Sequence, residues 1–357
     1  MVTLLTTMKI ALIHNVQSTG SALYRLELPH AHLDAAYKGL TFYSAPDPFR
    51  ISDESFEQMD IVLVSRMWGE TPEQIKWLRD KCTQFKVTLI LDLDDYWVLE
   101  SGHPMVNVYR EKNISNIIRD HIRVVDHVIC TNAYLKEKVS ILNPNVSVIP
   151  NCTFSGYEQY KLKPEASEFV RFGWFGGAQH YEDIILMESG MGILADDRSL
   201  NGLYRLYLGG WNENPMYEAY ERVFTSNGKQ ENYGRIEAAD IYSYVGGYNF
   251  VDVCLAPLRD TTFNRCKSEL KLVEAGTMGK AIIASDVYPY NTIIDHGLNG
   301  FLVREARSKD WHKYIKTLIH EKDLRLTLAA NLKETIETEF NIDYWGAKRM
   351  DLYHSLR

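Results

Sequence analysis

The stretch Asn264–Gly279 contains Lys267, Lys271 and Glu274 at a spacing that could bind a phosphate ester that also carries a diol. If this stretch is helical, Lys271 and Glu274 share a face, and Lys267 lies one turn earlier or at the cap. Lysines beside the free N–H groups of a helix start favour a diphosphate, and Ser268 adds a hydroxyl there. The carboxylate of Glu274 could accept both hydroxyls of a ribose. The alternative is an ordinary surface helix whose Lys/Glu pair contributes roughly a few tenths of a kcal/mol.

A second group of carboxylates closes the apolar run Val87–Asp95. Asp92, Asp94 and Asp95 form a D-x-D pattern, which can hold Mn²⁺ or Mg²⁺ and would then indicate a single-domain fold. That interpretation leaves the second half of the chain unexplained, so we expect no metal site. At the end of a strand, Asp94 or Asp95 could instead orient a substrate hydroxyl. Capping of the following turn is the structural alternative.

Buried strands alternate with helices along the chain, which is typical of doubly wound α/β domains. Clear helical patterns cover Thr71–Cys82 and Asn113–Val125. Apolar runs that end in polar residues predict buried parallel strands. In the first half these runs are Lys9–Asn15, Leu40–Ala45, Ile61–Arg66, Val87–Asp95, His127–Asn132 and Val146–Asn151, and in the second half they are Val170–Gly177, Leu203–Gly210, Val251–Leu258, Lys280–Asp286 and Gly300–Val303.

The length of 357 residues fits two domains rather than one. A polar segment, 153–168, interrupts the apolar runs and is the best candidate for a linker. We therefore predict an N-terminal domain over 1–152, a C-terminal domain over 169–340 and a terminal helix over 341–357. The tail from Asp310 onward is predicted to be helical, with breaks near Lys322 and Asn341.

Composition narrows the class of protein. The net charge of −8 offers no general attraction for nucleic acid or anionic lipid, although a local basic groove remains compatible with it. The five cysteines are odd in number and lie far apart, mostly in or beside apolar runs, so we expect core thiols in a reducing compartment and no zinc site. The first residues lack the pattern of a signal peptide and no run is long enough to span a membrane, which predicts a cytoplasmic location.

Five pieces of the chain, in order, resemble one enzyme family. The resemblance is to the retaining glycosyltransferases of the GT-B fold, and most of all to their "glycosyltransferase group 1" branch. It covers most of the second half, and the first half matches more weakly. The pieces are Val146–Asn151, Phe172–Asp183, Val251–Leu258, the K-S-x-x-K-x-x-E-A-G-x-x-G pattern of Lys267–Gly279, and Ala281–Val303.

The resemblance implies an α/β chain with two facing Rossmann-like domains and a C-terminal helical tail. It implies transfer of a sugar from a nucleotide-diphosphate donor, a UDP-sugar foremost, to an acceptor hydroxyl with retention of configuration and without a cofactor. The donor would be held by the C-terminal domain, the acceptor by the N-terminal one, and the reaction would occur in the cleft between them. In the family's front-face route the leaving diphosphate helps to deprotonate the acceptor.

Carried over position by position, the resemblance assigns donor binding to Gly20, Gly176, Gly177, Glu274 and the stretch Lys267–Lys271. Asp94, Asp95, His180, Tyr24 and Arg25 are added because they lie near the ends of strands or the helix start that would face the cleft. The candidate roles are then as follows. Catalytic roles fall to Lys267, Lys271, Asp94 and Asp95. Donor binding falls to Gly20, Gly176, Gly177, His180, Lys267, Ser268, Lys271 and Glu274, and acceptor binding to Tyr24, Arg25 and Asp94.

Several of these positions also have structural interpretations. His180 could be an ordinary residue of a helix start, and Arg25 could pair with Glu27 or Asp34 at the surface. The aromatic stretch Glu237–Phe250 reads as a packed helix and turn, or, over Tyr244–Gly247, as a neighbour of the nucleobase.

Two positions depart from the family pattern. Cys266 stands where the branch usually has the first of two glutamates, and a thiol cannot do a carboxylate's work on a sugar hydroxyl. The loop Gly176–Ile184 lacks the Arg and Lys that the family often has there, so the phosphate charge falls on Lys267, Lys271 or Arg265.

The acceptor and the reaction class stay open at this point. A glycan, a lipid-linked saccharide or a small metabolite could accept the sugar, and so could a hydroxymethylated base of phage DNA, which the acidic charge makes less favourable. A sugar-nucleotide epimerase of the same fold would convert the donor without any acceptor. A non-catalytic nucleotide-sugar-binding module, suggested by Cys266, would bind the donor without consuming it.

Overall fold

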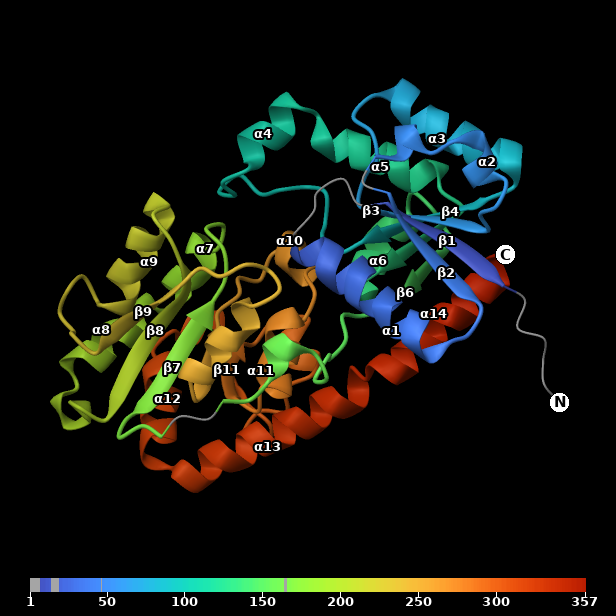
Figure 1. The fold of residues 1–357 in the computed structure, drawn as a ribbon. Coiled ribbons are helices and arrows are strands. Elements are labelled where there is room, and N and C mark those ends of the chain that lie inside the picture. Colours follow the sequence, from blue (N-terminus) through green and yellow to red (C-terminus); the bar gives the residue numbers. More distant parts are fainter. Residues whose placement is uncertain (1–6, 14–18, 46, 164–165) are drawn as a thin grey trace. The chain divides into compact units, whose positions relative to one another are not determined.

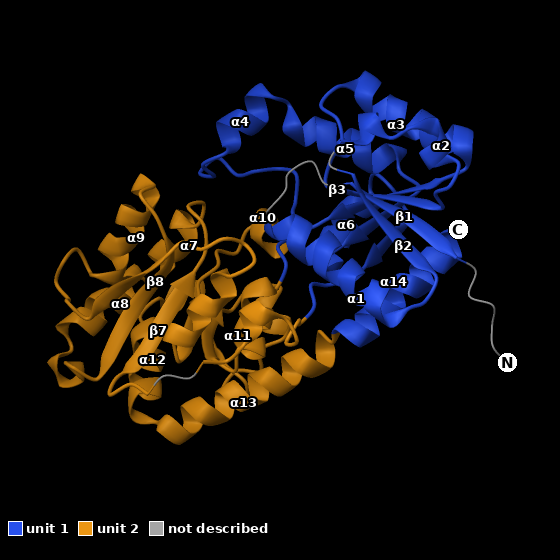
Figure 2. Ribbon diagram, viewed as in Figure 1, with its two compact units in different colours: residues 1–152, 266–268, 342–357 blue, residues 153–265, 269–341 orange. Residues whose placement is uncertain are grey.

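The computed structural model describes residues 7–13, 19–45, 47–163 and 166–357, and these form two parallel six-stranded sheets with helices around them (Figure 1). The predicted α/β class and the predicted pair of sheets are therefore confirmed. The chain divides into two compact units (Figure 2). Unit 1 comprises Met1–Cys152, Cys266–Ser268 and Ile342–Arg357, and unit 2 comprises Thr153–Arg265 and Glu269–Asn341.

Unit 1 contains the sheet β2-β1-β3-β4-β5-β6. His14 and Asn15, the end of the first predicted strand, lie outside the described residues. The strands are β1 (Met8–Ile13), β2 (Leu40–Ala45), β3 (Ile61–Ser65), β4 (Thr88–Leu93), β5 (His127–Cys130) and β6 (Val146–Val148). The α-helices are α1 (Leu28–Ala36), α2 (Asp53–Phe56), α3 (Pro72–Phe85), α4 (Val106–Glu111), α5 (Ile114–Val124), α6 (Ala133–Ser140) and α14 (Ile342–Leu356); a π-helical turn, η1 (Ala22–Glu27), leads directly into α1, and η2 (Pro48–Arg50) is a 3₁₀ turn.

Both faces of this sheet are buried, because side chains alternate along each strand and helices cover both sides. In β3, Val62 and Val64 face a core that includes Leu78 of α3. Ile61 and Leu63 face the opposite core, to which α14 contributes Met350 and Tyr353. The terminal helix, predicted as a separate element, is thus part of unit 1.

Unit 2 contains the sheet β12-β11-β10-β7-β8-β9. Its strands are β7 (Val170–Phe175), β8 (Tyr204–Trp211), β9 (Tyr233–Glu237), β10 (Val253–Ala256), β11 (Ala281–Ser285) and β12 (Phe301–Val303). Its α-helices are α7 (Tyr181–Ile184), α8 (Glu188–Asp196), α9 (Pro215–Phe224), α10 (Thr262–Arg265), α11 (Leu270–Thr277), α12 (Asp310–His320) and α13 (Lys322–Glu339); its 3₁₀ turns are η3 (Glu158–Tyr160), η4 (Ile185–Met187), η5 (Arg198–Leu200), η6 (Tyr244–Phe250), η7 (Tyr290–Thr292) and η8 (Glu305–Arg307).

The segment 153–168, predicted as a linker, packs on unit 2 over the residues described there. Thr153 N donates to the carbonyl oxygen of Phe340 at 2.9 Å, and Gln159 and Tyr160 in η3 are buried. The helical tail ends its first two helices at His320 and Glu339, close to the predicted breaks. No helix among the described residues has the length and apolar character needed to cross a bilayer.

Each sheet has one point at which the chain reverses the direction in which it adds strands. In unit 1 this point lies between β1 and β3, and in unit 2 between β7 and β10. Open α/β sheets bind ligands at the carboxyl ends of the strands beside such a switch point. The loops after β1 and β3 in unit 1, and after β7 and β10 in unit 2, are therefore the places to look for a site.

Candidate functional site

Lys271 lies at the switch point of unit 2, in the first turn of α11. Its Nζ donates to the carbonyl oxygen of Phe175 at the end of β7, and it lies 5.0 Å from the centre of the Trp174 ring. A side chain at Gly176 would lie 2.6 Å from the Trp174 ring and 3.1 Å from Nζ. Gly176 thus leaves room for the lysine, and the arrangement places a cation at the carboxyl end of the central strand.

Glu274 lies on the same helix, one turn after Lys271, and is 3% exposed. One carboxylate oxygen accepts a hydrogen bond from the Tyr244 hydroxyl, and the other accepts one from the Tyr248 hydroxyl at 2.7 Å. Burial, followed by the charge of Glu274, raises the pKa of Tyr248 well above its ordinary value, so Tyr248 remains a donor. A buried carboxylate that accepts two hydroxyl groups has the chemistry needed to hold a diol.

His180 follows the glycine pair, and Asp183 fixes its orientation. Nδ1 of His180 lies 2.8 Å from Oδ2 of Asp183, and its backbone N–H donates to the Tyr220 hydroxyl at 2.8 Å. Oδ1 of Asp183 accepts from the backbone N–H of Arg259 and from the side chain of Asn264, both at 2.9 Å. A carboxylate oxygen can only accept a hydrogen bond, so His180 carries its proton on Nδ1 and donates it to Asp183. Nε2 is the ring nitrogen that does not take part in this contact. The loop after β7 is thus joined to the loop after β10.

A second cluster lies at the switch point of unit 1. Asp94 accepts a hydrogen bond from the Ser21 hydroxyl, and Nη1 of Arg66 lies 3.7 Å from an oxygen of Asp94 and 3.7 Å from one of Asp95. Arg66 also donates to the Tyr109 hydroxyl. Its φ of 60° is in the left-handed region, where a non-glycine residue costs on the order of 1 kcal/mol or more. Strain of this kind persists where surrounding contacts fix a residue for function.

The two carboxylates of this cluster differ in their surroundings. Both side chains are partly buried, with Asp94 17% and Asp95 35% exposed. Burial, followed by the negative charge of Asp94, raises the pKa of Asp95 above its ordinary value, against the opposing charges of Arg66 and Lys267. Asp95 therefore holds a proton more readily than an isolated aspartate, which suits a group that handles a hydroxyl.

The predicted phosphate-binding stretch divides between the two units. Helix α11 begins at Leu270, so Lys267 and Ser268 precede it. Asn132 donates to the carbonyl oxygen of Lys267 at 2.8 Å, and Asn151 donates to the Ser268 hydroxyl at 3.0 Å. Lys267 and Ser268 belong to unit 1, whereas Lys271 and Glu274 belong to unit 2.

Cys266 is a core residue of unit 1. It is fully buried in the same core as Cys130, and burial raises the pKa of its thiol to about 12. The thiol that replaces the family's usual first glutamate is thus a neutral packing group in this chain.

Tyr24 and Arg25, two of the predicted acceptor-binding residues, are buried in unit 1, each 1% exposed. Nε of Arg25 pairs with Asp92 at 2.7 Å, and its Nη1 donates to Asn151 at 3.1 Å. The partner is therefore neither Glu27 nor Asp34, and the charge of Arg25 is used inside the fold. Because neither side chain is open to a substrate, we do not carry them into the acceptor site proposed below.

The remaining predicted positions are less informative. Asp92 is paired with Arg25 and Arg349 inside the fold. In the part of the chain that the structure describes, no three His, Cys, Asp or Glu side chains are grouped as metal ligands. A side chain at Gly20 would meet nothing within 4 Å, and one at Gly177 would lie 2.6 Å from Gln179 Oε1.

Sequence reasoning missed several members of these clusters, among them Ser21, Arg66, Tyr109, Tyr248 and Asn264. Arg66 could have been found from the sequence, because it lies at the end of a predicted strand, as Asp94 does. Tyr109 and Asn264 could not, since their partners are distant in the sequence.

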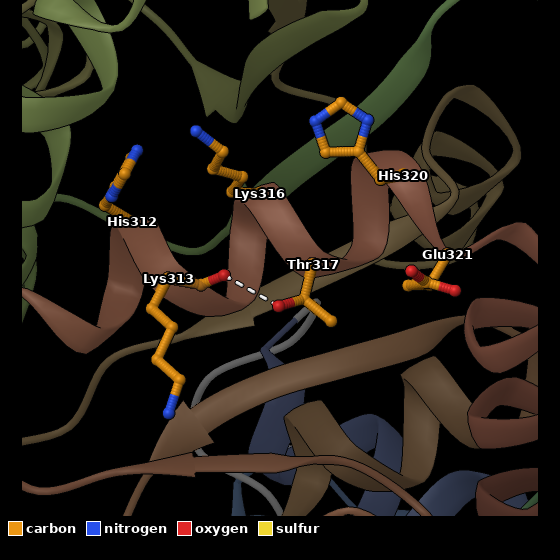
Figure 3. A pocket seen from close by; sticks show the side chains of 6 residues that line it. All are labelled: His312, Lys313, Lys316, Thr317, His320 and Glu321. Atoms are coloured by element: carbon orange, nitrogen blue, oxygen red, sulfur yellow. Dashed lines mark hydrogen bonds between the residues drawn. The ribbon is translucent and has the colours of Figure 1, made fainter.

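A shallow hollow of about 470 Å³ lies beside α12, lined by His312, Lys313, Lys316, Thr317, His320 and Glu321. In Figure 3, Lys316 and Lys313 project to opposite sides of the helix. Lys316 donates to Asp197 at 2.7 Å, and His312 lies 3.2 Å from the same carboxylate. The hollow lies along a covering helix rather than at the carboxyl ends of the strands, and we assign it no ligand.

Comparison with known proteins agrees with the predicted resemblance. Residues 270–335, which contain Lys271 and Glu274, match the family model of the glycosyl transferases group 1. An uncharacterized glycosyltransferase of Methanocaldococcus jannaschii is 26% identical over 212 residues, which is 58% of this chain and 54% of that protein. The match thus spans about half the length of this curated relative.

Solved structures support the fold. The Anabaena protein HepE, determined in complex with UDP and glucose, has a TM-score of 0.66 and 14% identity, over 98% of this chain and 100% of that one. Sucrose-phosphate synthase from Thermosynechococcus elongatus has a TM-score of 0.66 and 15% identity, over 98% and 99%. The chain therefore has the GT-B fold, and it resembles the group 1 glycosyltransferases as the sequence predicted.

Proposed function

We propose that this protein is a glycosyltransferase that moves a sugar from a nucleoside-diphosphate donor to an acceptor hydroxyl with retention of configuration. The observation that carries the proposal is the pair Lys271 and Glu274, one turn apart on α11 at the switch point of the second sheet, inside the segment that matches the family model. A cation and a diol-binding carboxylate at this point suit a nucleotide diphosphate.

Unit 2 binds the donor in this proposal. Glu274 accepts the ribose hydroxyls, Lys271 stabilises the charge of the diphosphate, and the backbone at Gly176 and Gly177 approaches the phosphates. His180, oriented by Asp183, contacts the sugar or the phosphate nearest to it. UDP is the first nucleotide to test, because the structurally similar HepE was determined in complex with UDP and glucose.

Unit 1 supplies the acceptor groups. We assign Asp94 and Asp95 to the orientation of the acceptor hydroxyl, with Arg66 holding both carboxylates at 3.7 Å. Lys267 and Ser268, on the segment that returns to unit 1, contribute charge and a hydroxyl toward the diphosphate. The acceptor is a glycan in this proposal, and a hydroxymethylated DNA base is the second candidate.

The reaction breaks the bond between the anomeric carbon and the diphosphate oxygen. The acceptor oxygen forms its bond to the same carbon on the same face, and its proton passes to the leaving phosphate. The chain's part is electrostatic: Lys271 stabilises the negative charge that grows on the diphosphate as this bond breaks. No metal ion is needed for that role in this proposal.

The test is donor consumption by wild type and by Lys271→Ala, with radiolabelled UDP-glucose and other UDP-sugars, with and without EDTA. We expect the variant to lose at least roughly a hundredfold in turnover, as for other lost oxyanion-type contacts, while its thermal unfolding stays near that of wild type. Lys313→Ala, on the exposed surface of α12, is the matched control and should keep full activity. Wild-type turnover in Lys271→Ala would overturn the assignment.

Product analysis separates the remaining alternatives. An epimerase would yield an altered nucleotide-sugar with no acceptor present. A binding module, the interpretation suggested by Cys266, would bind the nucleotide and release no diphosphate even by slow hydrolysis. Transfer to a glycan, with the anomeric configuration of the product read by NMR, supports the proposal in full.

A further inference from the structure

The two tyrosines that hold Glu274 differ in ways that suggest different roles. Tyr248 is 2% exposed, and its ring stacks on Phe175 with ring centres 4.2 Å apart and planes 17° from parallel. Phe175 ends β7 and also accepts the hydrogen bond from Lys271. Tyr248 is therefore fixed on the central strand of the sheet.

Tyr244 begins the same 3₁₀ turn, η6, but is only half-buried. The Tyr244 hydroxyl donates a hydrogen bond to Oε1 of Glu274, whereas the Tyr248 hydroxyl donates to Oε2. Since Glu274 is 3% exposed, a ligand hydroxyl must approach it from the side where its surroundings are most open, and Tyr244 is the more exposed of the two tyrosines. A ribose that reaches this carboxylate therefore meets Tyr244 first.

The hydroxyl groups of Tyr244 and Tyr248 resemble the hydroxyl groups that a ribose would offer to Glu274. A phenol hydroxyl on a carboxylate oxygen makes the same kind of hydrogen bond that one hydroxyl of a ribose would supply. The two phenol hydroxyls satisfy the buried charge of Glu274, which would otherwise be costly.

We propose that the Tyr244 hydroxyl holds the place of a ribose hydroxyl on Glu274 and is displaced when the nucleotide binds, whereas Tyr248 stays and orients the carboxylate. This inference rests on the proposed function, because it takes Glu274 as the ribose-binding group. It makes Tyr244 a specificity residue: a nucleotide without the 2′-hydroxyl has no group to put in place of the phenol, so it leaves the Tyr244 bond unbroken and does not gain that contact with Glu274.

The test is calorimetric titration of four proteins: wild type, Tyr244→Phe, Tyr248→Phe and Tyr242→Phe. UDP, GDP, ADP and CDP are first screened on wild type, and the tightest binder is then used together with its 2′-deoxy analogue. Tyr242 is the matched control, because it is on the same segment and 51% exposed.

We expect Tyr244→Phe to bind the ribonucleotide roughly five- to tenfold more tightly than wild type, since the empty site no longer has a bond to give up. Its gain for the 2′-deoxy analogue should be smaller. Tyr248→Phe should bind the ribonucleotide more weakly, and Tyr242→Phe should match wild type. Thermal unfolding without nucleotide reports whether each variant is folded, and Tyr244→Phe should unfold at a slightly lower temperature.

The outcomes separate this inference from the proposed function. If a nucleotide binds wild type and Tyr244→Phe weakens binding or leaves it unchanged, the inference is overturned and the proposed function stands. If the gain is equal for the ribo- and 2′-deoxynucleotide, Tyr244 blocks the site without standing in for the ribose, which also overturns the inference. If none of the four diphosphates binds wild type, both fall.

Discussion

His121 of α5 is a buried histidine whose two nitrogens have opposite roles. Nδ1 lies 2.7 Å from the carbonyl oxygen of Ile117 and donates to it, while Nε2 accepts from the backbone N–H groups of Trp68 and Gly69 at 3.1 and 3.3 Å. Only the neutral ring can do both, because a protonated ring has no acceptor. Burial accordingly lowers the pKa of His121 to about 4.

The lowered pKa predicts a specific loss of stability in acid. Between about pH 6.5 and 4 the unfolded chain binds a proton that the folded His121 does not, so the free energy of unfolding falls as the pH falls. From pH 7.5 to 5.5 this contribution is about 1.4 kcal/mol. In urea unfolding, His121→Gln should therefore show a smaller decrease over this range than wild type, by about that amount. The exposed His320→Gln should keep the wild-type decrease, and an unchanged decrease in His121→Gln would contradict the prediction.

Asp183 is the residue that gives His180 its orientation, and its removal tests that role. Asp183→Asn keeps the size of the side chain but loses the charge that pairs with Nδ1, and it turns an acceptor of Asn264 into a competing donor. We expect kcat to fall roughly tenfold to a hundredfold, as for the loss of a hydrogen bond to a charged group. The neighbouring Glu182→Gln, which removes only the contact with Arg259, should lose less than about twofold. Equal losses in the two variants would show that the loop as a whole is disturbed.

At the scale of elements, α14 closes the core of unit 1 with a buried cation. Arg349 is 2% exposed, lies 3.3 Å from Oδ2 of Asp92, and donates to the Tyr353 hydroxyl at 3.3 Å. Asp92 also pairs with Arg25, so one carboxylate is shared by two buried guanidinium groups. Removing one member of such a group leaves a charge without its partner in a poorly solvated place.

We expect Arg349→Met to destabilise unit 1 by about 3 to 5 kcal/mol, the range for breaking a buried ion pair. The adjacent Lys348 is exposed, and Lys348→Met should change stability by less than about 0.5 kcal/mol. Urea unfolding of the two variants and wild type measures both values. A loss below about 1 kcal/mol for Arg349→Met would mean that the pair with Arg25 alone satisfies Asp92.

Elements of this fold could be predicted from the sequence wherever burial was complete. The central strands are continuous apolar runs because both sheets are covered on both faces. β9 was missed because it pairs only with β8, and its residues Tyr233–Glu237 are half-buried or exposed, so they lack an apolar run. The partners of Lys267 and Ser268 were not predictable, since these residues accept hydrogen bonds from Asn132 and Asn151, which are more than a hundred residues away in the chain.

The candidate site was predictable from the sequence only where it depends on local spacing. Lys271 and Glu274 follow from helical spacing, which is local. The tyrosine partners of Glu274 and the pairing of Arg25 with Asp92 depend on tertiary contacts, which no local pattern encodes. The charge of Arg25 looked available to a ligand only because its partner could not be seen.

For the whole molecule, the proposal predicts where a nucleotide changes hydrogen exchange. UDP should protect the end of β7, the turn η6 and helix α11, because these carry Lys271, Glu274 and their partners. Helix α3 in unit 1 should exchange at the same rate with and without UDP. Glu274→Gln is the control, in which protection at η6 should be lost at the same UDP concentration. Protection that is confined to unit 1 would contradict the assignment of the donor to unit 2.

Unit 1 is made of three separate segments, and the last of them, Ile342–Arg357, follows unit 2 in the chain. Arg349 and Tyr353, which complete its core, are therefore synthesised after all of unit 2. Domains usually fold in the order of synthesis, the N-terminal one first. Here unit 2 can finish while the nascent unit 1 still lacks α14, so the part of the protein that is made first is completed last. Until α14 has been synthesised, the apolar face of unit 1 that this helix covers has no partner and is accessible to chaperones.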